Sequence, residues 1–141
     1  MELAEPSDTS DIIVLRAPRG KGTLPVMRVV IGGVASRHAL SVDRLDDIEL
    51  ALETLLREEP DEGNDLTLAV SVVGETFKVA LGGLSSQVVR QTLSGTESID
   101  SGRDALSDVL RMLMDSLVDG YRTADGPTAR SFTVEMEKRI S

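Results

Sequence analysis

The chain has 141 residues, which is enough for one domain of ordinary size with a continuous core. Its 24 acidic residues outnumber its 15 basic residues, and the formal net charge of -9 argues against binding to nucleic acid or to anionic membranes. The absence of cysteine excludes disulfides and thiolate metal sites, and a single histidine excludes a histidine-rich metal site. Aromatic residues make up only 2% of the sequence, so we expect an aliphatic core and few surfaces on which bases could stack.

The first ten residues, MELAEPSDTS, are polar and acidic and show no periodicity. We therefore expect residues 1–10 to form a flexible acidic tail and residues 11–141 to form a single domain. A secretory signal would begin with basic residues followed by an apolar run, and no apolar run in the chain approaches the ~20 residues of a membrane span. The sequence therefore predicts a cytoplasmic protein without membrane association.

Two elements are expected before residue 41. The β-branched run IIVLRA at residues 12–17 ends at Pro18 and is typical of a strand. Apolar residues recur at helical spacing over 24–40, which predicts the first helix. Gly32 and Gly33 weaken this helix or let another backbone come close to it.

A second helix and a hairpin are expected next. Ser41 or Asp43 can cap the helix, whose apolar stripe ends before Pro60. The period then changes from 3.6 to 2, because apolar and smaller or polar residues alternate through most of 66–81. This alternation predicts an antiparallel hairpin that turns at residues 74–75, where a glycine comes first.

The segment 82–102 is rich in Gly and Ser and is predicted to be the longest weakly structured part of the domain, with at most a short helical piece around 88–93. A capping box formed by Ser101 and Asp104 then introduces the clearest amphipathic helix, over 104–118.

A final hairpin over residues 121–136 completes the predicted order of strand, two helices, hairpin, loop, helix and hairpin. This order predicts an α+β two-layer sandwich, with helices on one face of a mostly antiparallel sheet.

Two long strings carry a resemblance to a known family. VMRVVIGGVASRHALSVDRLDDIELALETLL is similar to the first two helices, and LRMLMDSLVDGYRTADGPTARSFTVEMEKRI to the last helix and terminal hairpin, of the anti-sigma serine kinases. These kinases belong to the histidine-kinase, gyrase and Hsp90-type ATPase superfamily. The resemblance covers about residues 12–140 and implies a Bergerat-type ATPase fold, with a nucleotide pocket between the helices and the sheet.

The motifs of that family are incomplete in this chain. The family's second helix carries a Glu and, four residues later, an Asn that holds magnesium; here Glu53 is followed by Arg57, which cannot coordinate a cation. Gly82 stands at the position where the family has an Asp that recognises the amino group of adenine. The glycine-rich lid is reduced to the widely spaced Gly95 and Gly102, which are poorly placed to cradle phosphates. The resemblance therefore implies a degenerate ATP site.

Glu53 has two interpretations. Glu49, Glu53 and Arg57 follow one another at four-residue spacing, a pattern that favours a solvated surface row with a Glu–Arg pair. The alternative is that Arg57 contacts a phosphate directly in place of the metal, and Glu53 stays a candidate base. Arg28 is a candidate for partner binding, because the family uses an Arg of its first helix to bind protein partners. The alternative interpretation, that Arg28 is an ordinary surface charge, is equally consistent with the sequence.

The other charged candidates are interpreted as structural or solvated. His38 falls near the end of the first helix, where a cation suits the helix dipole. Residues 16–23, RAPRGKGT, lack the glycine spacing of a phosphate loop and are interpreted as a solvated basic turn. Asp115 and Asp119 are four residues apart, but nothing in the sequence supplies a cleft for paired carboxylates.

Two functions are consistent with these features. The first is a non-catalytic regulatory module, similar to anti-sigma factors, that binds a sigma factor or an anti-anti-sigma protein and needs no cofactor. The second is a divergent serine/threonine kinase that uses ATP and magnesium to act on an anti-sigma antagonist. The sequence leaves open whether the protein forms a homodimer.

Overall fold

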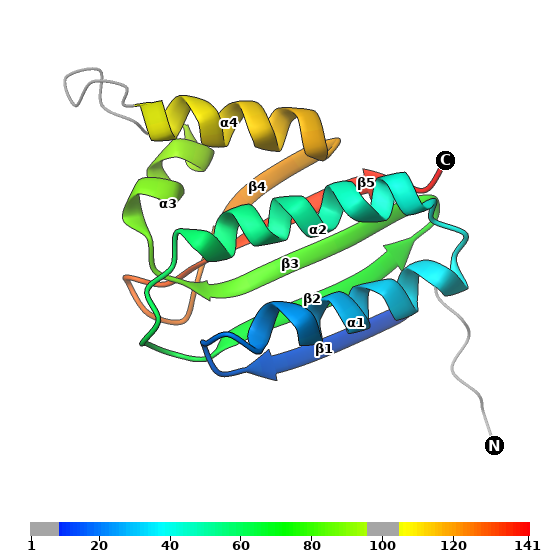
Figure 1. The fold of residues 1–141 in the computed structure, drawn as a ribbon, viewed down its shortest axis with the longest axis horizontal. Coiled ribbons are helices and arrows are strands. Elements are labelled where there is room, and N and C mark those ends of the chain that lie inside the picture. The colour runs from blue at the N-terminus through cyan, green and yellow to red at the C-terminus, as the bar shows by residue number, and fades with distance from the viewer. Residues whose placement is uncertain (1–8, 96–104) are drawn as a thin grey trace.

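The computed structural model describes residues 9–95 and 105–141. It is an α+β protein in which a five-stranded antiparallel sheet packs with four helices (Figure 1), as the element order predicts. The elements are β1 (Thr9–Ala17), α1 (Thr23–Arg37), α2 (Val42–Arg57), β2 (Leu66–Val73), β3 (Thr76–Leu84), α3 (Gln87–Ser94), α4 (Ala105–Leu117), β4 (Gly120–Asp125) and β5 (Phe132–Arg139).

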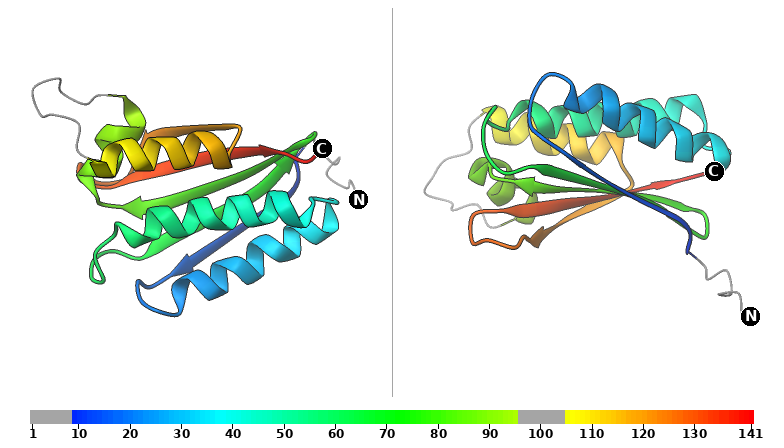
Figure 2. Two further views of the ribbon diagram at one scale, coloured as in Figure 1. Left: turned by 45° about the horizontal axis from the view of Figure 1, so that its top comes forward. Right: turned by 90° about the horizontal axis from the view of Figure 1, so that it is seen from below.

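The sheet has the strand order β1-β2-β3-β5-β4, and all four pairings are antiparallel. β1 and β4 are therefore the edge strands. Figure 2 shows α1, α2 and α4 lying together on one face of the sheet, with α3 at one end of it. Within the described residues, no helix covers the opposite face, which we call the open face.

A helix cap and a turn glycine, both recognisable from neighbouring residues in the sequence, define the start of α2 and the β2–β3 turn. The Ser41 side chain accepts a hydrogen bond from the Arg44 backbone N–H at 3.2 Å and caps α2, so Ser41 and not Asp43 begins this helix. The β2–β3 hairpin turns between Val73 and Thr76, and Gly74 has a φ of 60°, which glycine adopts without strain.

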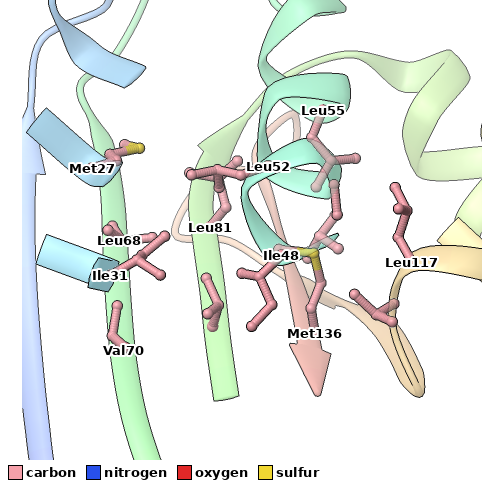
Figure 3. Close-up of a cluster of buried hydrophobic side chains, with 14 of the residues drawn as sticks. Met27, Ile31, Ile48, Leu52, Leu55, Leu68, Val70, Leu81, Leu117 and Met136 are labelled. Atoms are coloured by element: carbon pink, nitrogen blue, oxygen red, sulfur yellow. The ribbon is translucent and has the colours of Figure 1, made fainter. Parts of the chain in front are cut away.

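Aliphatic side chains fill the space between the helices and the sheet (Figure 3). Met27 and Ile31 of α1 meet β2, while Leu52 of α2 lies against Leu81 of β3. Each of these four side chains has an exposed fraction of 0%. Burial of such residues, at roughly 1.5–3 kcal/mol each, is the main force that holds the two layers together.

The boundaries of β1 and β3 correct two predictions. β1 begins at Thr9, so the predicted tail of residues 1–10 includes two residues of a strand, while residues 1–8 lie outside the described part. The predicted weakly structured segment 82–102 is wrong at its start, because β3 continues to Leu84. A register shift between Leu81 and Leu84 lets the strand pass two glycines and stay paired with β5.

The helix α3 is also longer than the predicted helical piece around 88–93. The Ser86 side chain accepts a hydrogen bond from the Val89 N–H, and Gly95 ends the helix with a φ of 75°. These caps stabilise an eight-residue helix whose Val89 and Leu93 are buried. The α4 prediction is confirmed, but its capping box at residues 101–104 lies outside the described residues.

A buried ion pair joins three connections at one end of the sheet. Arg19 donates from Nη1 to Glu59 at 2.7 Å, and both side chains are only 4% exposed. Arg19 also donates to the backbone carbonyls of Asn64 and Gly83 at 2.7 and 2.6 Å. The interpretation of residues 16–23 as a solvated turn is therefore wrong for Arg19, whose partners are distant in sequence.

The Glu59 carboxylate accepts further bonds at the start of α3. The Ser85 N–H donates to it at 2.9 Å and the Ser86 N–H at 2.9 Å. A carboxylate is stabilised beside the positive end of a helix, and here it satisfies backbone donors that the helix itself cannot. The Arg19–Glu59 pair thus connects the β1–α1 turn, the α2–β2 loop and the β3–α3 connection.

Replacing Arg19 with alanine should lower the free energy of unfolding by about 3–5 kcal/mol, because the Glu59 carboxylate would stay buried without its cation. Arg122→Ala is the matched control: Arg122 pairs with Glu135 at 2.8 Å, but its side chain is 75% exposed. The control should change the same quantity by less than about 1 kcal/mol. Urea denaturation measures both, and equal losses would contradict the structural role of the buried pair.

Candidate functional site

Three of the residues singled out in the sequence form one cluster on the helical surface. Glu53 of α2 accepts a hydrogen bond from Arg28 of α1 at 2.9 Å through Oε1. Its Oε2 accepts a bond from Arg57, one turn later on α2, at 2.7 Å. The side chains of Arg28, Glu53 and Arg57 are 44%, 30% and 67% exposed. We call these three residues the arginine–glutamate cluster.

The cluster confirms the predicted Glu53–Arg57 pair and adds Arg28, which the sequence did not connect to it. Both oxygens of Glu53 are engaged by guanidinium groups, and Glu53 points toward α1 rather than into the core. A general base must reach a substrate proton, and a divalent cation would be repelled by two neighbouring arginines. The geometry therefore favours the surface interpretation of Glu53.

One turn earlier, the same side of α2 carries Glu49. Partial burial raises the pKa of Glu49, the positive charge of Arg28 lowers it, and Asp46 raises it further. Arg28 therefore interacts with two carboxyl groups of α2, through a direct bond to Glu53 and through its field at Glu49. Arg28 is therefore an electrostatic contact between the first two helices.

Gly82 lies on the open face of the sheet and not beside the arginine–glutamate cluster. It pairs with Thr67, and a Cβ at this position would come within 2.5 Å of the Thr67 Oγ1 and 3.0 Å of the Thr133 Oγ1. Thr67 is exposed between two buried neighbours, so a side chain at residue 82 would point away from the helices. The neighbouring residue that faces the helices is Leu81, which packs into the core.

The remaining candidates are spread over separate places. Asp115 accepts a bond from the Tyr121 hydroxyl at 3.0 Å, and burial together with this bond raises the pKa of Tyr121. Asp119 accepts a bond from the Arg139 N–H at 2.7 Å, so the two acids do not form a pair. The C-cap of α1 is His38. Gly102 lies outside the described residues.

The outward side of α1 is a feature that motif reasoning missed. Val26 and Val29 are 47% and 75% exposed on either side of Arg28 in the sequence. Gly32 and Gly33 follow, and a Cβ at either position would meet nothing within 4 Å. We call Arg28, Val29 and Gly32, which lie on one side of the helix, the α1 surface. Both the exposed valines and the interior helical glycines are unfavourable for the stability of an isolated helix.

The charge pattern contains a signal that could have identified this region. Residues 12–42 contain five Lys and Arg residues and no Asp or Glu, in a chain whose formal net charge is -9. Three of the five, Arg16, Arg19 and Arg28, form ion pairs with Asp65, Glu59 and Glu53 of later segments, so much of this positive charge is neutralised within the fold.

No protein-family model and no curated protein sequence matches this chain. In residues 9–95 and 105–141, no helix is both long enough and apolar enough to cross a bilayer. The same residues contain no group of three or more His, Asp or Glu side chains placed to hold a metal ion.

Replacing Gly33 with alanine should raise the free energy of unfolding by about 0.5–1 kcal/mol, because glycine is costly in a helix interior and the added methyl group has open space. Gly83→Ala is the contrasting variant: its φ is 82° and the new Cβ would lie 2.5 Å from the Asp65 carbonyl oxygen. The Gly83→Ala variant should be less stable than the unmodified chain, because alanine strains this backbone conformation and its Cβ would clash with the carbonyl oxygen. Thermal unfolding measures both, and a loss of stability at Gly33 would show that this glycine is needed for packing within the chain.

Proposed function

We propose that this protein is a non-catalytic regulatory module of the anti-sigma type, which binds a sigma factor or an anti-anti-sigma protein in the bacterial cytoplasm. Its unit of binding is the domain that begins with β1 at Thr9, a Bergerat-type ATPase fold that has lost its ATP site. The arginine–glutamate cluster carries the proposal, because the one acid that the resemblance would make catalytic is held by two arginines.

Two further observations support the loss of the ATP site. Arg57 brings a positive charge to the position where the family holds magnesium, and its guanidinium already bonds to Glu53. Leu81 and Leu52 fill the adjoining space between β3 and α2 with apolar atoms, which leaves no acceptor there for an adenine amino group. The alternative, a divergent kinase, requires Arg57 to leave Glu53 and bind phosphate.

The α1 surface supports the binding role. Val29 supplies apolar contact area, and the neighbouring Arg28 supplies a cation that is already oriented by Glu53. A side chain held in place before binding loses less conformational entropy when a partner arrives. We infer that Arg28 meets an acidic group of the partner while Val29 meets an apolar residue. Stoichiometric binding of this kind withholds the partner from its other targets and requires no cofactor.

Arg28→Glu should weaken capture of the partner at least tenfold, on the order of the effect of truncating one side of a close interfacial charge pair. The test is a pull-down with purified chain against each sigma factor and each anti-anti-sigma protein of the source genome. Arg122→Glu, a matched charge reversal at an exposed position of β4, should capture the same partner as well as the unmodified chain.

A double variant separates a binding role from a structural one. Arg28→Glu combined with Glu53→Arg restores an ion pair between α1 and α2 but moves the positive charge to α2. If Arg28 itself contacts the partner, capture should stay weak while the melting temperature returns toward its original value. Full capture by the double variant would remove Arg28 from the interface.

A further inference from the structure

The open face of the sheet is hollowed over the strands β2, β3, β5 and β4. The hollow has a volume of about 340 Å³, within the roughly 300–1,000 Å³ that is typical of small-molecule sites. Small residues form its floor: Ala69, Ala80 and Gly120. Charged side chains form its rim: Lys78, Arg122, Glu135 and Glu137. The rim residues of β5 lie on either side of Met136, which is buried against the helices, so they face away from the helical layer.

The strand register places a cation and a carboxylate opposite each other on one side of the hollow. Lys78 of β3 is the register partner of Glu137 of β5. The Lys78 Nζ and the Glu137 Oε1 are 3.7 Å apart, which is longer than the ~2.7–2.9 Å of a charge-assisted hydrogen bond. Within the described residues, neither charged group makes a hydrogen bond. The two charges are therefore held close together by the sheet without being bonded to each other.

The pair on the neighbouring side of the hollow is closed. Arg122 donates to the Glu135 Oε1 from Nε at 3.0 Å and from Nη2 at 2.8 Å. This pair satisfies itself and forms a wall of the hollow. The contrast indicates that Lys78 and Glu137 are the charged groups of the rim with bonding capacity to spare.

The closeness of these two charges decides which ligand can bind. An anion attracted to Lys78 would lie within a few ångströms of the Glu137 carboxylate and be repelled by it, and a cation attracted to Glu137 would be repelled by Lys78. A molecule with a carboxylate beside an ammonium group avoids both penalties. The Ser71 hydroxyl adds a donor for the carboxylate, because Ser71 lines the hollow and is the register partner of Lys78 on β2.

We propose that this hollow binds a free α-amino acid with an aliphatic side chain. The ammonium nitrogen and a carboxylate oxygen of such a molecule are roughly 3 Å apart, which matches the separation of Lys78 and Glu137. Its carboxylate bonds to Lys78 and Ser71, its ammonium group bonds to Glu137, and its side chain lies on the small residues of the floor. The site is on the opposite side of the sheet from α1 and α2 (Figure 2), so it is independent of the arginine–glutamate cluster and of the proposed partner.

Three probes test the proposal by NMR titration of the backbone amides at about pH 6.5, where an α-amino group is mostly protonated. They are L-leucine, N-acetyl-L-leucine, which lacks the ammonium group, and L-leucinamide, which lacks the carboxylate. Leucine should shift the amide signals of 69–71, 78–80 and 135–137 saturably, with a dissociation constant of about 5 mM or lower. The other two should bind at least about fivefold more weakly. No saturation by leucine, or equal binding of all three, would overturn the proposal.

Variants of the two charged residues provide a second test. Lys78→Gln and Glu137→Gln should each weaken leucine binding at least about fivefold, and both should fold normally because exposed ion pairs add little stability. Arg16→Gln is the matched control: Arg16 is also on the open face and pairs with Asp65 at 3.2 Å, but it does not line the hollow. This control should bind leucine as the unmodified chain does. An equal loss in Arg16→Gln would show a general effect of surface charge and would contradict the site.

The single-charge probes test whether repulsion sets the choice of ligand. Lys78→Gln should bind leucinamide more tightly than the unmodified chain does, because the ammonium group that repels it is gone. Glu137→Gln should improve binding of N-acetyl-leucine for the corresponding reason. If neither variant changes its preference among the three probes, the two charges do not select the ligand and the proposal is wrong.

Discussion

The buried ion pair between Arg19 and Glu59 fixes one end of the molecule, and the positions of α2, α3 and the start of α1 depend on it. Burying two charges is costly, and it is tolerated here because backbone carbonyls and N–H groups satisfy the remaining donors and acceptors. The carboxylate of Glu59 also accepts hydrogen bonds from the Ser85 and Ser86 N–H groups, immediately before the first turn of α3. The Arg19–Glu59 pair is therefore a structural feature of the end of the sheet where α3 begins. Within the described residues, no buried side-chain nitrogen or oxygen lacks a hydrogen-bond partner.

The elements whose signals are local could be predicted from the sequence, and those that depend on distant partners could not. The alternation in β2 and β3 and the apolar stripes of α2 and α4 are local, and the structure confirms these elements. Arg19 looked like part of a solvated turn because its partner, Glu59, is 40 residues away. The extent of α3 was missed because glycine and serine around it suggested a loop, while burial of Val89 and Leu93 stabilises a helix.

The candidate site shows the same division. The Glu53–Arg57 pair follows from four-residue spacing on one helix, but the third member, Arg28, comes from α1 and could be placed only by the packing of two helices. Gly82 was matched to an adenine-reading position from its place in the sequence, whereas the strand register shows that this position faces the open side of the sheet. The lack of acidic residues from 12 to 42 can be seen in the sequence, but only the fold shows that Arg16, Arg19 and Arg28 pair with acids of later segments.

The loss of the ATP site is tested most directly by the melting temperature of the protein in millimolar ATP and magnesium. A ligand that binds only the folded state at 100 times its dissociation constant adds ~2.7 kcal/mol of stability, which shifts the melting temperature of a domain of this size by several degrees. If Arg57 and Glu53 are a surface pair and no adenine reader is present, the melting curve should not move. A saturable rise with ATP that GTP does not reproduce, and that disappears in Arg57→Ala, would show that Arg57 holds a nucleotide phosphate and would contradict the non-catalytic function.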